Sequence, residues 1–159
     1  MPSVAHEQAV AVYTELLDAW NRQDADAFAA LFAPDAQVTG FDGSQMTGPT
    51  GIASELGAIF AQHRTAAYVA KVREVRSLDA AVTLLRAVAG MIPPGASALN
   101  PAVNAIQTLV LTTGQSSSRP QIVHFQNTPA AFHGRPQLVE AMTAELTRVH
   151  EAGLVVARD

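Results

Sequence analysis

The sequence predicts an α+β domain in which N-terminal helices and one C-terminal helix pack on an antiparallel sheet. Up to Arg64 the apolar residues recur at helical spacing, whereas residues 66–128 adopt the period of two that is typical of strands. Helical segments followed by a run of strands favour α+β architecture over a parallel, doubly wound sheet. A length of 159 residues fits one domain over residues 1–159.

Three helices are expected before the sheet. Apolar residues at spacings of three and four predict the first over residues 4–22, and Asp24 can cap a second over residues 25–32. Residues 35–44 predict a strand and a turn, and residues 47–64 predict the third helix.

A four-stranded antiparallel meander is expected next. Its strands cover residues 66–78, 81–92, 102–114 and 120–128. A loop rich in proline and glycine separates the second strand from the third. An amphipathic helix over residues 134–153 closes the chain, and Pro136 suits its first turn.

The second and third strands are apolar on both faces. In the second strand, Leu84 and Val88 lie on one face, and Leu85 and Ala87 lie on the other. An antiparallel sheet with one solvated face would instead alternate apolar and polar residues. One face can pack on the helices, so we expect a second subunit to cover the other and form a homodimer through the outer sheet face.

Composition excludes several classes of function. A net charge of −4 with a single lysine, Lys71, argues against a nucleic-acid partner, and no apolar run is long enough for a membrane helix. The chain has no cysteine, no HxH or HExxH spacing and no glycine-rich nucleotide motif, so neither a metal nor a cofactor is expected. The N-terminus lacks a secretory signal pattern, which predicts a cytoplasmic protein.

Several stretches carry a family resemblance. "AWNRQDADAFAALFAPDA" (19–36) resembles the entry segment of SnoaL-like domains, and "VHFQNTPAAF" resembles their last strand, including that of the calcium/calmodulin kinase association domain. "YVAKVREVR", "LLRAVAGMIPPGASALNPAVNAIQTLV" and "FQNTPAAFHGRP" are similar to the SgcJ/EcaC branch, found in actinobacteria and tied to enediyne polyketide gene clusters. One departure is Pro120, where many members have tryptophan, so the last strand should start at an edge or a bend.

The resemblance covers residues 4–146 and implies the nuclear-transport-factor-2-like cone. In that fold a curved antiparallel sheet and the helices enclose a mostly apolar pocket with a few polar groups. Related isomerases place an aspartate or a histidine in it as general base. His124 and Asp42 are the candidates here, and each has a structural alternative: His124 as a core or interface residue, and Asp42 as a turn residue.

The candidates for binding a ligand are aromatic and polar residues, and each has a structural alternative. The aromatic candidates can equally be core residues, and Arg86 can pair with Glu74 instead of an anionic ligand. Gln126 and Asn127 point to opposite faces of a regular strand, and we favour Asn127 for the pocket. The full set is Tyr13, Trp20, Phe41, Phe60, Arg86, Gln107, Gln126 and Asn127.

Two functions are compatible with the sequence. The first is a small-molecule-binding protein of enediyne-type polyketide biosynthesis, which holds an apolar polyene or aromatic intermediate in the cone. Such a protein could also act as a cofactor-independent isomerase or cyclase by acid–base chemistry, and the sequence leaves open whether it is an enzyme. The alternative is a non-catalytic dimeric accessory or assembly module that docks on a polyketide synthase.

Overall fold

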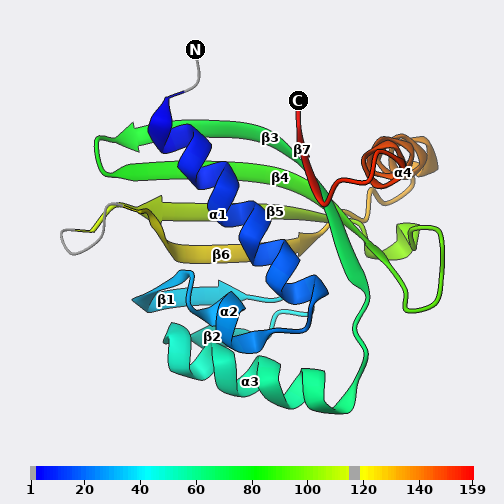
Figure 1. Ribbon diagram of the computed structural model, residues 1–159. Coiled ribbons are helices and arrows are strands. Elements are labelled where there is room, and N and C mark those ends of the chain that lie inside the picture. The colour runs from blue at the N-terminus through cyan, green and yellow to red at the C-terminus, as the bar shows by residue number, and fades with distance from the viewer. Residues whose placement is uncertain (1–2, 115–118) are drawn as a thin grey trace.

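A computed structural model gives the fold and describes residues 3–114 and 119–159 (Figure 1). Its centre is one curved, seven-stranded mixed sheet with the strand order β2-β1-β6-β5-β4-β3-β7. The strands are β1 (Phe32–Thr39), β2 (Gln45–Thr47), β3 (Ala67–Asp79), β4 (Val82–Ile92), β5 (Ala105–Thr112), β6 (Gln121–Pro129) and β7 (Val156–Arg158). The helices are α1 (Val4–Asn21), α2 (Ala25–Ala29), α3 (Gly48–Gln62), α4 (Pro136–Glu151) and a short 3₁₀ helix, η1 (Pro101–Val103). This arrangement confirms the expected α+β fold class.

The inner face of the sheet carries the main core. Helix α1 crosses this face (Figure 1) and buries a stripe at helical spacing, for which Val12, Leu16 and Leu17 are fully buried examples. Helices α2 and α3 add apolar side chains to the same cluster, including Phe28 and Ile52. Ser3 and Asp24 cap the starts of α1 and α2 by accepting hydrogen bonds from backbone N–H groups, as residues of this type do at helix N-termini.

The sheet differs from the expected antiparallel meander at both edges. Strands β3 to β6 form that meander, but β1 pairs parallel with β6 and β7 pairs parallel with β3. The second helix is also shorter than expected, because it ends at Ala29 and the chain is already in a strand at Phe32. Pro34 therefore lies within an irregular part of β1 and does not end a helix.

Part of the outer face is covered by the chain itself. Met142, Leu146 and Val149 of α4 form a second apolar cluster with Val69 of β3 and Val88 of β4. Helix α4 therefore covers the part of the outer face beneath it, where a second subunit was expected. The same helix extends the core across the sheet, so both faces contribute buried apolar area.

An ion-pair network joins α4 to β3 and to the last described residue. Glu145 lies 2.5 Å from Nη2 of Arg73 and 3.4 Å from Nζ of Lys71, and Asp159 contacts the same two cations at 3.2 and 3.3 Å. The pKa of Glu145 lies below its ordinary value. The main cause is the hydrogen bond from Arg73, followed by the positive charges of Arg73 and Lys71. A lowered pKa stabilises the folded chain at pH values above the unfolded pKa, and this stability is lost as pH falls through the folded pKa.

We expect Glu145→Gln to lower the free energy of unfolding by about 1 kcal/mol at pH 7, because the network is partly exposed. The loss should shrink as pH falls from the unfolded glutamate pKa of about 4.3 through the lower folded pKa, since the parent carboxylate then becomes protonated as well. Urea unfolding at pH 7 and pH 3 measures this difference. Glu140→Gln, at an exposed position of the same helix, is the matched control. An equal loss for Glu145→Gln at both pH values would contradict the expectation.

None of the helices in the described part of the chain is long and apolar enough to cross a membrane.

Candidate functional site

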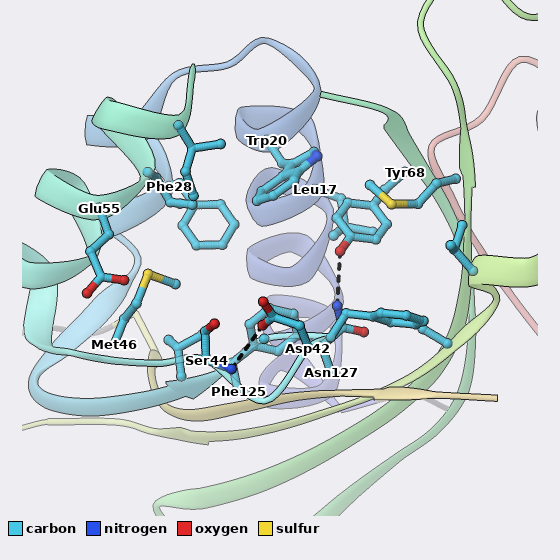
Figure 2. A pocket seen from close by; sticks show the side chains of 18 residues that line it. Leu17, Trp20, Phe28, Asp42, Ser44, Met46, Glu55, Tyr68, Phe125 and Asn127 are labelled. Carbon is cyan, nitrogen blue, oxygen red and sulfur yellow. Dashed lines mark hydrogen bonds between the residues drawn. The ribbon is translucent and has the colours of Figure 1, made fainter. Parts of the chain in front are cut away.

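A cavity of about 360 Å³ lies between the inner sheet face and helices α1, α2 and α3 (Figure 2). Its lining is mostly apolar and comes from the three N-terminal helices and the sheet, with Leu17 from α1, Phe28 from α2, Leu56 from α3 and Phe125 from β6. Small-molecule sites usually combine such a lining with a few placed polar groups. The volume lies near the lower end of the range for such sites, which is about 300–1,000 Å³.

Trp20 forms one wall of the cavity and is held in place on several sides. Its indole N–H donates a hydrogen bond to the carbonyl of Ala66 at 2.9 Å. Its ring makes an edge contact with Phe60, with centroids 5.3 Å apart, and a tilted contact with Tyr68 at 5.4 Å. Trp20 therefore lines the cavity, whereas Phe60 supports it from outside the lining. Phe41, in the turn after β1, also lines the cavity.

A chain of buried hydrogen bonds ends at the cavity. The Tyr13 hydroxyl donates to Oε1 of Gln107 at 2.5 Å, and Nε2 of Gln107 donates to Oδ1 of Asn127 at 3.4 Å. Nδ2 of Asn127 then donates to the hydroxyl oxygen of Tyr68 at 3.1 Å (Figure 2). Only Asn127 and Tyr68 line the cavity, while Tyr13 and Gln107 are completely buried behind it.

The backbone of Tyr68, the last member of the hydrogen-bond chain, is held by Asn21. Asn21, the last residue of α1, accepts a hydrogen bond from the Tyr68 N–H at 2.7 Å and donates one to the Tyr68 carbonyl at 3.0 Å. Gln107 and Asn127 meet because they are partners in the antiparallel pairing of β5 and β6 and both point inward.

Both tyrosines are neutral at pH 7, and burial moves the pKa of each further above neutrality. It raises the pKa of Tyr68 to about 12, and the facing amide groups of Asn127 and Gln107 offset part of this effect. Burial, followed by the neighbouring Tyr68, raises the pKa of Tyr13 well above its ordinary value. A phenol is neutral well below its pKa, so both hydroxyl protons are present at pH 7.

Three exposed polar residues of the lining are acidic or hydroxylic. Asp42 and Ser44 belong to the turn after β1, and Glu55 belongs to α3. The Asp42 carboxylate accepts a hydrogen bond from the Ser44 N–H at 2.9 Å. Hydrogen bonds from the side chain and the backbone of Ser44 lower the pKa of Asp42. The exposed part of the cavity therefore carries carboxylates, in contrast to its buried polar corner.

Three of the sequence candidates lie on the outer face, away from this cavity. Arg86 is a neighbour of Glu74 across β3 and β4, and its Nε donates to Glu74 Oε1 at 2.9 Å. His124 Nε2 lies 3.2 Å from Oε1 of Gln126, and both side chains belong to β6. Strand alternation places these side chains opposite Ala87, Phe125 and the rest of the inner face.

The last strand is not regular, which changes one expectation. A shift in the pairing of β5 with β6 after Val110 lets Ile122 point into the core together with Phe125 and Asn127. Perfect alternation would have placed Ile122 on the face of His124 and Gln126. Asn127 nevertheless faces inward, where the sequence analysis favoured it.

Sequence reasoning missed Tyr68, which closes the hydrogen-bond chain. The signal was its position at the start of a strand, on the face that continues with Ala70 and Val72. It also missed Phe28, Phe125 and Met46 as parts of the lining. Within residues 3–114 and 119–159, no group of three histidine, aspartate or glutamate side chains is placed to hold a metal ion.

Comparison with solved structures places this geometry among known folds. A domain of unknown function with a cystatin-like fold from Nostoc punctiforme is 25% identical, with a TM-score of 0.76, and 95% of each chain is covered. A ketosteroid isomerase-like protein from Erwinia carotovora atroseptica is 16% identical, with a TM-score of 0.63 over 81% of this chain and 98% of that one. An NTF-2 like protein from Shewanella oneidensis is 14% identical, with a TM-score of 0.59 over 77% and 97%.

No curated protein matches the sequence significantly. The family model of the SnoaL-like domain matches residues 13–126, a span that runs from the buried Tyr13 to the strand that carries Phe125. This span includes most of the cavity lining and all but one member of the hydrogen-bond chain, Asn127, which directly follows it. The chain therefore belongs to the SnoaL-like domain family.

Proposed function

We propose that this protein binds one small, largely apolar molecule in the cavity. The observation that carries the proposal is an apolar space of about 360 Å³ with an aromatic wall at Trp20 and a buried polar corner at Tyr68 and Asn127. Planar conjugated molecules suit such walls, because aromatic faces and edges offer both apolar area and favourable ring geometry. The corner would set the orientation of the ligand.

The finer proposal is that the ligand is a polyene or aromatic intermediate of enediyne-type polyketide biosynthesis. Its support is the resemblance of residues 68–76, 84–110 and 125–136 to the SgcJ/EcaC branch. The cavity is compatible with it, because its interior favours apolar conjugated molecules over highly charged ones.

Acid–base catalysis of a cyclisation or an isomerisation is the enzymatic form of this proposal. Of the two base candidates, only Asp42 lines the cavity, and its hydrogen bonds to Ser44 lower its pKa. A lower pKa makes a carboxylate a weaker base at neutral pH. We therefore put ligand binding first, with Asp42 as the base if the protein is an enzyme.

Trp20 allows a direct test because it is the only tryptophan of the chain and lines the cavity. We expect diphenylhexatriene, an apolar polyene, to quench Trp20 fluorescence saturably with a stoichiometry of about one, as expected for a single apolar cavity. Ala105→Phe should abolish this quenching, because Ala105 is buried in the lining and the larger ring fills the space.

The matched control is Thr108→Phe, which places the same ring on the outer face of the same strand. Thermal unfolding of both variants checks that each is folded. Quenching that survives Ala105→Phe, or that Thr108→Phe removes equally, would place the polyene outside the cavity and reject the proposal.

A dimeric accessory module, with a polyketide synthase as its partner, is the second candidate. It is favoured by Leu84 and Val110, which are paired in register on the outer face and are not part of the cluster beneath α4. We expect a mass of twice 16.7 kDa by light scattering, and a monomer after Leu84→Arg. A monomeric parent protein at micromolar concentration would rule out this form of the proposal.

A further inference from the structure

We propose that the Tyr68 hydroxyl acts as a hydrogen-bond donor that selects apolar ligands with a carbonyl oxygen, and that Tyr13 and Gln107 hold it in this state from behind the cavity wall. The proposal rests on the proposed ligand-binding function and names the class of ligand. Neither Tyr13 nor Gln107 lines the cavity, so both are positioning residues.

The direction of the hydrogen-bond chain carries the argument. Each amide in the chain joins two neighbours through one oxygen and one nitrogen, so all the bonds must run the same way. In the observed direction Tyr13 is the first donor and the Tyr68 oxygen is the last acceptor. Besides the second N–H of each amide, the proton left without an acceptor in the chain is then that of the Tyr68 hydroxyl.

The opposite direction would leave a proton unsatisfied inside the core. Both amides would be flipped, Tyr68 would donate to Asn127, and the Tyr13 oxygen would become the last acceptor. Among the described residues, the hydrogen-bond partner of the Tyr13 hydroxyl is Gln107, and Tyr13 is completely buried. Its proton would have no acceptor, which costs about 1–3 kcal/mol for a buried group. Tyr68, in contrast, lines a cavity where a ligand or water can accept its proton.

The corner of the cavity consequently offers donors. The oxygen of Tyr68 already accepts the bond from Asn127, and the Gln107 amide faces it as well. Asn127 uses one of its two N–H bonds on Tyr68 and retains the second, and its Oδ1 already accepts from Gln107. The acceptors of the lining, the carboxylates of Asp42 and Glu55, are on exposed residues.

A carbonyl oxygen matches such a corner. It has two lone pairs, donates no proton of its own, and can sit at the end of an otherwise apolar skeleton. A hydrocarbon of the same shape would leave the Tyr68 proton unpaired or require a trapped water, and an alcohol would bring a second proton without a buried acceptor. The cavity is therefore expected to prefer a ketone to the corresponding hydrocarbon.

The test compares 9-fluorenone with fluorene, two tricyclic probes that differ in one carbonyl group, by isothermal titration calorimetry. We expect the parent protein to bind the ketone about tenfold more tightly, as one or two neutral hydrogen bonds allow. Tyr68→Phe should bring this ratio close to one. Tyr13→Phe should lower the affinity ratio at least threefold. Without the Tyr13 hydroxyl the Gln107 amide can turn over, so the direction of the hydrogen-bond chain is no longer fixed.

The carbonyl stretching band of bound 9-fluorenone is the second readout. In the parent protein it should lie at a lower frequency than in hexane, and Tyr13→Phe should shift it back toward the hexane value. Thr14→Val is the matched control, since it removes a hydroxyl of α1 that bonds to the Val10 carbonyl and lies outside the chain. It should leave both the ratio and the band unchanged.

Gln107→Met interrupts the chain at its centre and replaces Tyr13→Phe if that variant does not fold. A parent-like ratio and band in the folded variant would overturn the proposal. Equal affinities of the parent protein for the two probes would also overturn it. The proposed binding of apolar ligands would still stand in that case. Failure of diphenylhexatriene and both tricyclic probes to bind would overturn the proposed function as well.

Discussion

Trp20→Ala is expected to lower the free energy of unfolding by about 3 kcal/mol and to weaken polyene binding more than tenfold. The indole contacts Phe28, Phe60 and Tyr68, so its removal leaves a hole where α1, α2, α3 and β3 meet. Large-to-small substitutions in such places cost about 3–5 kcal/mol when the side chain is fully buried, and Trp20 is partly buried. The affinity for the polyene falls because one wall of the cavity is lost.

Trp20→Phe separates the two contributions of this side chain. A phenyl ring retains an aromatic wall but cannot donate a hydrogen bond to the Ala66 carbonyl. We therefore expect Trp20→Phe to lower the free energy of unfolding by about 1 kcal/mol. Urea unfolding and diphenylhexatriene fluorescence measure stability and binding in both variants. Unchanged stability of Trp20→Ala would show that the aromatic cluster does not hold α1 on the sheet.

Leu146→Ala is expected to cost about 2–5 kcal/mol of stability, because Leu146 is the completely buried residue through which α4 contacts the outer sheet face. Gly90 of β4 makes this contact close: a Cβ there would lie 3.0 Å from Cδ1 of Leu146. The shortened side chain leaves a cavity that the rigid sheet cannot close.

Leu138→Ala is the matched control on the same helix, since Leu138 is 36% exposed. It should change the free energy of unfolding by less than about 0.5 kcal/mol. Comparable losses in the two variants would contradict the view that α4 covers the outer face through one buried stripe. The loss in Leu146→Ala should leave the cavity intact, because α4 lies on the other side of the sheet from Trp20.

The long elements could be predicted because their periodicity reflects burial. The helices α1, α3 and α4 and the strands β3 to β6 all have patterns long enough to distinguish spacings of 3.6 and 2. Strands β2 and β7 have three residues each, and their conformation depends on pairing with β1 and β3. A short segment whose structure is fixed by a distant partner leaves little signal in its own residues.

The site was predictable to the extent that strand alternation held. Gln107 and Asn127 were both candidates, and their cross-strand pairing follows from the register of β5 and β6. Strand alternation alone puts Ile122 on the wrong face, because the irregular pairing after Val110 has no marker in the residues of β6. Tyr68 was missed because its role depends on three partners from other elements, Asn21, Gln107 and Asn127.

The central claim is that the cavity holds an apolar ligand whose carbonyl oxygen is bound at its buried polar corner. A crystal structure of the protein with 9-fluorenone tests this claim most directly. The account predicts the rings against Trp20 and Phe125, with the carbonyl oxygen within hydrogen-bond distance of the Tyr68 hydroxyl. A probe bound on the outer face, or in the cavity with its oxygen directed away from Tyr68 and toward Asp42, would contradict it.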